Sequence, residues 1–238
     1  MNQEAKVAII TGASQGIGAG LVQGYLEHGF RVVANSRSIP PASPETPNLI
    51  TVAGDAAEPE TAERVFHAAL ERFGRVDTLI NNAGIFVPKP FVDYTLEDFN
   101  KILAVNLASF FHFSQRAVKQ MLRQGSGHIV QISTFLTDQP LHVIPAALAS
   151  LSKGGINAVT RSLAIEYADK GIRVNAVSLG AIKTPMHAPE THGFLASLHP
   201  VQRMGEVRDV VDAILYLESA SFVTGEVLNV DGGLVAGR

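Results

Sequence analysis

The stretch that decides the fold reads VAIITGASQGIG and covers residues 7–18. Its apolar, largely β-branched start predicts a short buried strand, and its glycines predict a tight turn that opens a helix. Glycine lets the backbone approach a pyrophosphate, and a helix N-terminus supplies free N–H groups and the positive end of a dipole. The spacing is Gly-x-x-x-Gly-x-Gly rather than Gly-x-Gly-x-x-Gly. The stretch alone therefore indicates a nucleotide site without establishing one.

Outward from this stretch, short β-branched runs alternate with longer segments of helical periodicity. The expected strands cover residues 7–10, 31–35, 49–52, 78–81, 128–132, 173–177 and 226–230. The expected helices lie near residues 16–28, 59–73, 96–124, 147–170 and 206–219. This alternation is typical of βαβ units. We predict one α/β domain over residues 1–238, a three-layer Rossmann fold whose doubly wound, seven-stranded parallel sheet carries helices on both faces.

Two segments break the alternation. Residues 39–47 contain several prolines and cannot form a helix, because proline removes a backbone donor and fixes φ. We expect them to replace the short helix usually found between the second and third strands. Residues 185–200 contain prolines, a glycine and three histidines, and we expect a loop or a mobile lid. The histidine spacing does not form a helical metal pair, so we predict no metal site.

Composition narrows the class of protein further. The chain has 238 residues, 46% of them hydrophobic, which is enough for a large core in one domain. A net charge of -3 without a basic stripe argues against a nucleic-acid partner. No apolar run has the length of a membrane span, and the first six residues do not resemble a signal peptide. With no cysteine in the chain, we expect a soluble cytoplasmic protein that has no membrane partner.

Further motifs extend the pattern over nearly the whole chain. They are Thr11-Gly12-x-x-x-Gly16-x-Gly18, Asn81-Asn82-Ala83-Gly84, Val105-Asn106-Leu107, and residues 174–185, 224–227 and 230–233. With these motifs, in this order and spacing, the chain resembles the short-chain dehydrogenases/reductases. Leu179 departs from the proline that is usual there. The resemblance implies a nicotinamide-dependent oxidoreductase that acts on an unidentified alcohol or carbonyl substrate.

The resemblance also assigns roles at the cofactor site. Asp55 should bind the adenine, Lys153 the nicotinamide ribose, and Ile182 with Thr184 the carboxamide. On cap preference alone, Asp55 is alternatively a helix N-cap. The full set of implied cofactor-binding residues is Gly12, Ser14, Gln15, Gly16, Ile17, Gly18, Ser36, Arg37, Asp55, Asn81, Ala83, Gly84, Lys153, Ile182 and Thr184.

Arg37 indicates which nicotinamide cofactor binds. NAD-dependent members carry an acidic residue at the end of the second strand, where it binds the ribose 2′-hydroxyl. This chain has Ser36 and Arg37 there and no carboxylate that would repel a 2′-phosphate. A guanidinium pairs with a phosphate bidentately, so we favour NADP(H) over NAD(H). The alternative is that Arg37 is an ordinary solvated loop residue.

The catalytic residues implied by the resemblance are incomplete. The family's tetrad is Asn-Ser-Tyr-Lys, and Asn106 and Lys153 match two of its members. Thr134 stands at the usual serine position, with Ser133 just before it, and either hydroxyl can polarise a carbonyl. Four residues before Lys153, where the ammonium would lower the pKa of a tyrosine phenol that shuttles a proton, the chain has Ala149.

His142 is a candidate replacement for the missing phenol. It lies in the strand-to-helix connection, which is about two residues longer than usual and lines the substrate pocket in relatives. Imidazole titrates near neutral pH, as an acid–base catalyst must. The alternative, to which the sequence alone gives more weight, is a surface histidine. The departures at Thr134 and Leu179 favour natural divergence at Ala149 over an engineered substitution.

Three hypotheses remain open on the sequence. The first is a divergent NADP-dependent oxidoreductase that uses Lys153, Asn106, Ser133 or Thr134, with water or His142 transferring the proton. The second is a nucleotide-binding sensor or scaffold without turnover. The third is a lyase or isomerase that keeps the cofactor pocket for structural reasons.

The helix expected over residues 96–124 predicts a homotetramer, with a dimer as the alternative assembly. Its large apolar side chains lie on more than one face, so one face covers the sheet and another is free for a partner. A thicker core within one chain would also explain the pattern. The apolar residues are Leu103, Leu107, Phe110, Phe111, Phe113, Val118 and Met121.

Overall fold

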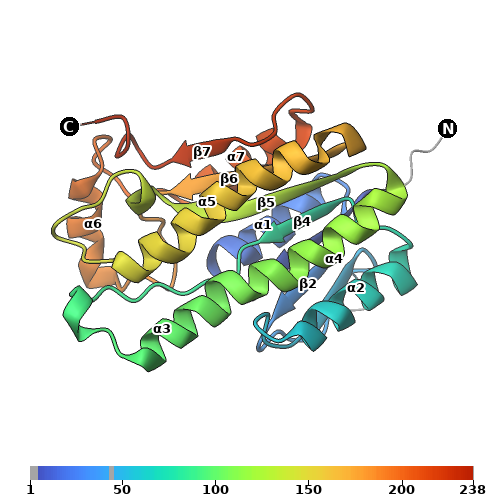
Figure 1. Cartoon of the computed structure of the whole chain (residues 1–238), viewed down its shortest axis with the longest axis horizontal. Helices are drawn as coiled ribbons and strands as arrows, with labels where there is room; N and C mark the ends of the chain where they lie inside the picture. The colour runs from blue at the N-terminus through green and yellow to red at the C-terminus, as the bar shows by residue number, and fades with distance from the viewer. Residues whose placement is uncertain (1–4, 43–45, 238) are drawn as a thin grey trace.

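A seven-stranded parallel sheet runs through the centre of the molecule in the order β3-β2-β1-β4-β5-β6-β7 (Figure 1). The computed structural model describes residues 5–42 and 46–237. The strands are β1 (Val7–Thr11), β2 (Arg31–Ser36), β3 (Leu49–Ala53), β4 (Thr78–Asn81), β5 (Gly127–Thr134), β6 (Ile172–Leu179) and β7 (Val227–Val230). The predicted fold class, a doubly wound parallel sheet between two helical layers, is confirmed.

Helices cover both faces of this sheet. The front layer in Figure 1 contains α2 (Pro59–Phe73), α4 (Ser109–Gln124) and α5 (Ala147–Tyr167). On the other face, α1 (Gly16–Glu27) packs beside α7 (Val207–Ser219). Successive residues of each buried strand enter opposite cores. Ile9 packs under the first layer, for example, and Ile10 under the second.

The long helix expected over residues 96–124 is interrupted. It consists of α3 (Leu96–Leu103), a π-helical turn over Ala104–Ala108, and α4. Asn106 lies buried inside this turn. A π-turn shifts the direction in which a helical side chain points, and such turns are frequent at functional sites.

The expectation of a loop over residues 185–200 was wrong in part. This segment contains a 3-10 turn (Pro189–Thr191) followed by α6 (His192–Leu198). Leu195 and Leu198 are three residues apart and both are buried, so tertiary packing forms a helix that propensity did not indicate. The described part of residues 39–47 contains no helix, as expected; residues 43–45, like residues 1–4 at the N-terminus, lie outside the described residues.

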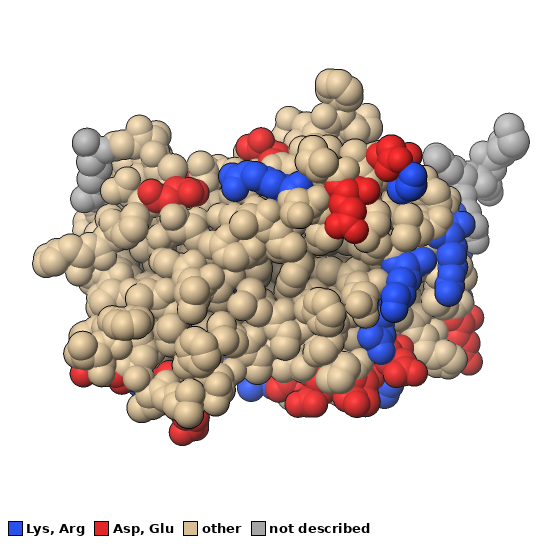
Figure 2. All heavy atoms as spheres, viewed as in Figure 1, with Lys and Arg blue, Asp and Glu red and all other residues tan. Residues whose placement is uncertain are grey.

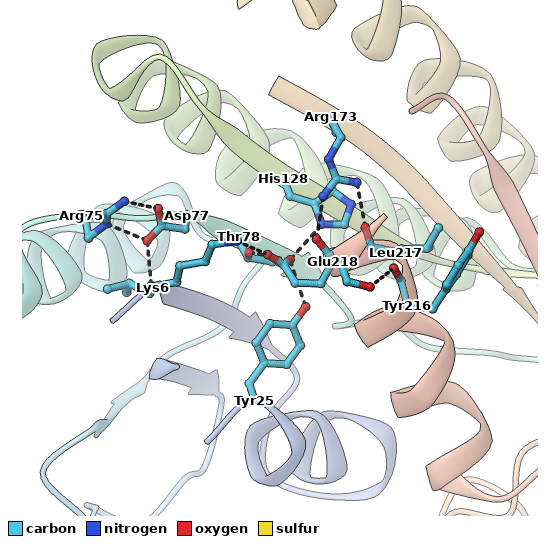
Figure 3. Close-up of polar contacts among 12 residues, drawn as sticks. Lys6, Tyr25, Arg75, Asp77, Thr78, His128, Arg173, Tyr216, Leu217 and Glu218 are labelled. Carbon is cyan, nitrogen blue, oxygen red and sulfur yellow. Dashed lines mark hydrogen bonds and ion pairs between the residues drawn. The ribbon is translucent and has the colours of Figure 1, made fainter. Parts of the chain in front are cut away.

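A buried polar cluster occupies the amino-terminal ends of the central strands (Figure 3). The Glu218 carboxylate, at the end of α7, accepts hydrogen bonds from Thr78 Oγ1 at 2.8 Å and His128 Nδ1 at 3.0 Å. The Lys6 ammonium at 3.3 Å and the Tyr25 hydroxyl at 3.5 Å complete its surroundings. The cluster ties α1, α7, β4 and β5 together at the end of the sheet opposite the cavity described below. No helix in the described parts of the chain has both the length and the apolar surface needed to cross a membrane.

Candidate active site

A cavity of about 740 Å³ opens at the carboxyl ends of the strands. Its lining comes from the residues that follow β1, β2, β3, β4 and β6, from the end of β5, and from α5 and α6. Strand ends of a parallel sheet meet at one edge, and ligands of open α/β sheets bind there. The cavity therefore has the position expected for a functional site.

The glycine-rich turn forms one wall and leaves no room for side chains. Gly12 has φ of 66°, and a Cβ there would lie 2.9 Å from Asn82 Nδ2. A Cβ at Gly18 would overlap the carbonyl oxygen of Gly12. The backbone of the turn therefore packs directly against the segment of Asn82 and Ala83. This glycine cradle fits the pyrophosphate of a dinucleotide.

Asn82 locks this turn, and sequence reasoning did not assign it that role. Its Nδ2 donates to the carbonyl oxygens of Thr11 at 2.9 Å and Gly12 at 3.1 Å. The Thr11 hydroxyl in turn accepts from the backbone N–H groups of Asn82 and Ala83. The predicted neighbour Asn81 does not line the cavity, because its side chain is buried against α4 and donates to Ser114 Oγ at 2.9 Å. The sequence did carry a signal for Asn82, because it is the second residue of the motif Asn81-Asn82-Ala83-Gly84.

The remaining predicted cofactor-binding residues all line the cavity. Asp55 Oδ1 accepts from the backbone N–H of Ala57 at 3.0 Å. The N-cap of α2 is Glu58, so the alternative assignment of Asp55 as that helix's N-cap was wrong. At the end of β2, Ser36 Oγ lies 2.9 Å from Ser14 Oγ, and Arg37 is exposed at the rim.

Lys153 and the two hydroxyl residues Ser133 and Thr134 also line the cavity. Lys153 Nζ donates to the carbonyl oxygen of Ile132 at 2.7 Å, and burial lowers the pKa of this ammonium to about 8. Ser133 is buried, and its Oγ has no hydrogen-bond partner within the described residues. Thr134 Oγ1 accepts from the backbone N–H of Leu136 at 3.4 Å, which leaves its own proton available to donate. The lining of the cavity thus contains two hydroxyl residues and one cation.

The Asn106 side chain forms hydrogen bonds that hold neighbouring elements together in this region. Its Oδ1 accepts from the backbone N–H of Ile85 at 2.9 Å, and its Nδ2 donates to the Ile85 carbonyl at 3.2 Å and to Ser152 Oγ at 3.1 Å. Asn106 therefore fastens the segment after β4 to α5. The π-turn that carries Asn106 directs its side chain to this position.

Ala149 also lines the cavity, one helical turn before Lys153. It is 5% exposed and packs in an apolar cluster with Phe135, Leu136 and Leu195. A methyl group neither donates nor accepts a proton. The cavity therefore has no phenol at this position.

The candidate His142 and the histidine His187 differ in their position relative to the cavity. His142 is exposed and is not among the residues that line the cavity. His187 does line it, and burial, followed by the charge of nearby His192, lowers the pKa of His187 below its ordinary value. Within the described residues, no three His, Asp or Glu side chains are grouped closely enough to hold a metal ion.

Comparison with known proteins agrees with this geometry. The family model described as Enoyl-(Acyl carrier protein) reductase matches residues 12–235. The 3beta-hydroxysteroid dehydrogenase 1 of Eggerthella lenta is 37% identical, and the alignment covers 97% of this chain and 94% of that protein. For the glucose 1-dehydrogenase of Gluconobacter oxydans, identity is 34% and coverage is 96% and 91%.

Solved structures give the same result. "ElxO with NADP Bound" superposes with a TM-score of 0.90 and 29% identity, covering 98% of this chain and all of that one. The 3-ketoacyl-(acyl-carrier-protein) reductase from Brucella melitensis, complexed with NADH, has a TM-score of 0.89 and 31% identity, with coverage of 98% and 99%. Full-length similarity on this scale confirms the resemblance seen in the sequence. The chain belongs to the short-chain dehydrogenase/reductase family.

Proposed function

We propose that this protein is an NADP(H)-dependent oxidoreductase that interconverts an alcohol and a carbonyl, with slow proton transfer because Ala149 replaces the family's tyrosine. One observation carries the proposal. A single cavity is lined by the glycine cradle, the Ser36–Arg37 pair, Lys153 and the hydroxyl residues Ser133 and Thr134. NADP(H), when bound, supplies or accepts the hydride. The chain's own residues stabilise the developing charge and transfer the proton.

The preference for NADP(H) is supported at the end of β2. Arg37 forms no hydrogen bond or ion pair with any described residue, so its guanidinium is free to pair with a 2′-phosphate. Ser36 and Ser14 add hydroxyl donors beside it. Fluorescence titration with NADPH and NADH tests the preference. Equal affinities for the two nucleotides would contradict it.

The hydroxyls and the ammonium supply the polar chemistry. Ser133 or Thr134 donates to the substrate oxygen and stabilises the charge that develops there. Lys153 holds the cofactor ribose and, through water in the space beside Ala149, gives its proton to that oxygen. Since its pKa is lowered to about 8, carbonyl reduction should fall as the pH rises through that value.

His142 is the second candidate for the proton donor. Its side chain would have to turn inward from the exposed loop to reach the cavity. The variant His142→Ala separates the two donors. Loss of turnover assigns the proton to His142, whereas unchanged turnover with the pH dependence above assigns it to Lys153 and water.

Apolar side chains in the lining favour an apolar substrate. Phe86, Val143, Ile144, Phe194 and Leu195 are among the residues that line the cavity. Burying apolar surface contributes about 25 cal/mol per Å² to binding, so alicyclic ketones should be better substrates than aldoses. A panel of both classes, followed by the loss of NADPH absorbance, tests this preference.

A nucleotide-binding protein without turnover is the second candidate function. The observation in its favour is again Ala149, because loss of the phenol affects proton transfer more than cofactor binding. Tight NADPH binding without turnover on any carbonyl or alcohol of the panel would favour this candidate. Absence of NADPH and NADH binding would contradict both functions.

A homotetramer completes the proposal, with a dimer as the alternative. Of the apolar residues on the long helix, Phe113, Val118 and Met121 are buried in the core, whereas Phe111 is 55% exposed. Figure 2 shows that charged side chains lie mainly at the edges of this face of the molecule. The exposed apolar side chains of α4 and α5 on which a second copy would pack are Phe111, Leu122, Leu151 and Ile165. A monomer by light scattering at micromolar concentration would contradict the assembly.

A further inference from the structure

His199 lies behind the cavity wall and is only 2% exposed. Its Nδ1 is 2.8 Å from the carbonyl oxygen of Leu195, and its Nε2 is 3.1 Å from the backbone nitrogen of Ala181. A carbonyl oxygen only accepts a hydrogen bond, and a backbone N–H only donates one. The contacts therefore require a neutral imidazole whose proton is on Nδ1 and whose Nε2 is an acceptor.

Two glycines leave the ring no room to turn. A Cβ at Gly180 would lie 2.6 Å from Nε2 of His199, and a Cβ at Gly232 would lie 3.3 Å from its Cδ2. The backbone of Gly180, just after β6, and that of Gly232, just after β7, therefore lie against the imidazole. Close packing on this scale transmits a displacement of one partner to the other.

The imidazole joins two walls of the cavity without lining it. Leu195 reaches the cavity from α6, and Ala181 reaches it from the segment that follows β6. The Ala181 carbonyl accepts from the backbone N–H of Gly205 at 3.0 Å, whereas its N–H is held by His199. Within the described residues, His199 is thus the side chain that connects α6 to this segment by two hydrogen bonds.

We propose that His199 is a positioning residue that fixes the segment of Ala181 and Ile182 against α6, so that the cofactor and the substrate meet a preformed wall. The inference rests on the proposed function, because it assigns Ile182 to the cofactor and Leu195 to the substrate side. Preorganised walls raise affinity by removing the cost of ordering them on binding. Loss of the Ala181 contact should therefore weaken cofactor binding more than it weakens folding.

Two conservative variants separate the two hydrogen bonds. In His199→Gln, the amide oxygen can occupy the place of Nε2 and still accept from Ala181. In His199→Asn, the shorter amide occupies the place of Nδ1 and can donate only to Leu195. If His199 had a merely structural role, both substitutions would change NADPH binding to a similar extent.

We expect His199→Asn, which loses the Ala181 hydrogen bond, to raise the NADPH dissociation constant about tenfold, and His199→Leu, which loses both hydrogen bonds, to raise it at least as much. His199→Gln should stay within about threefold of the unmodified protein. The matched control is His128→Asn, because His128 is also 2% exposed but lies at the opposite end of the sheet. This variant keeps a donor toward Glu218 and should leave the NADPH dissociation constant unchanged.

A measurement without cofactor keeps the inference separate from the proposed function. Amide hydrogen exchange of the ligand-free protein should show a protected Ala181 N–H in the unmodified protein and in His199→Gln, and faster exchange in His199→Asn. Absence of NADPH binding would overturn the proposed function. The hydrogen-exchange result would still test whether His199 fixes the segment of Ala181 and Ile182 against α6. Equal Ala181 protection in the Gln and Asn variants, or equal NADPH dissociation constants, would overturn the role of His199.

Discussion

At the amino-terminal ends of the strands, the Glu218 carboxylate accepts hydrogen bonds from Thr78, His128 and Tyr25. At the carboxyl ends, the buried Ser133 hydroxyl and the Asn35 side-chain oxygen have no hydrogen-bond partner within the described residues. An unpaired buried polar group costs about 1–3 kcal/mol. One end of the sheet is thus satisfied internally, and the other contains buried polar atoms without a hydrogen-bond partner among the described residues.

The two buried histidines show the same difference. His128 donates from Nδ1 to Glu218, and its Nε2 accepts from Asn175 Nδ2 at 3.1 Å. Burial lowers the pKa of His128, and hydrogen bonds from His128 and Thr78 outweigh burial and hold the pKa of Glu218 at about 2. His199 has the same 2% exposure but contacts only backbone groups beside the cavity. Changes at His128 should therefore affect folding, and changes at His199 should affect binding.

The largest effect should come from restoring a phenol at the carboxyl end. In Ala149→Tyr, a hydroxyl enters the cavity one turn before Lys153, and general acid–base assistance contributes about 10²–10⁴-fold. NADPH-dependent carbonyl reduction should rise by that factor, while the NADPH dissociation constant changes little. Steady-state rates and fluorescence titration measure the two quantities.

Ala149→Phe is the matched control, because it adds the same ring without a hydroxyl. It should give no gain in rate. An equal gain with Phe and Tyr, or brisk turnover of simple ketones by the unmodified protein, would show that the missing phenol does not limit the reaction.

A second large effect is expected at the opposite end. Glu218→Ala removes the acceptor for Thr78, His128 and Tyr25, and each buried donor left unpaired costs about 1–3 kcal/mol of unfolding free energy. Urea denaturation at pH 7 measures the loss. The NADPH dissociation constant of the folded variant should be unchanged, and a parallel loss of affinity would show that the two ends are not independent.

A smaller effect is expected at the rim of the cavity. Arg37→Ala removes the guanidinium that we assign to the 2′-phosphate, and NADPH binding should weaken by about 1.5–3 kcal/mol, the scale of a charge-assisted contact. NADH binding should barely change, since NADH has no 2′-phosphate. Calorimetric titration with both nucleotides provides the comparison. Equal weakening for both would place Arg37 in a general electrostatic role.

The fold was predictable because its signals are local and repeated. Each of the seven strands was expected within a few residues of its observed bounds, since β-branched runs and helical periodicity mark βαβ units. α6 was missed because its stability depends on where Leu195 and Leu198 are buried, which is a tertiary property. The π-turn around Asn106 was missed for the same reason, because periodicity does not show a single inserted residue.

The site was predictable where a motif fixes backbone geometry and less so where side chains decide. The glycine turn, Lys153 and Thr184 all line the cavity, as the resemblance implied. The motif did not show which of the neighbours Asn81 and Asn82 contacts the glycine turn. Successive residues at a strand end point to opposite sides, so only one of the two can do so. The exposed position of His142 and the tautomer of His199 depend on loop packing, for which one sequence carries no signal.

The smallest effect should follow mild acidification, and it comes from His128. Because burial holds the pKa of His128 below 6.5 in the folded protein, the unfolded chain binds the proton first. Stability is therefore fully present above pH 6.5 and is lost progressively as the pH falls below it. Glu218 adds a second loss only between pH 4.5 and about 2, because its pKa is lowered in the folded protein. Urea unfolding of the unmodified protein and His128→Asn at pH 8, 6.5 and 5.5 isolates the first loss. The variant should have a lower unfolding free energy at pH 8 but should lose less of it on acidification. If the unfolding free energies of the two proteins instead depend on pH in the same way, protonated His128 is tolerated beside Glu218, and this end of the sheet is not closed to charge.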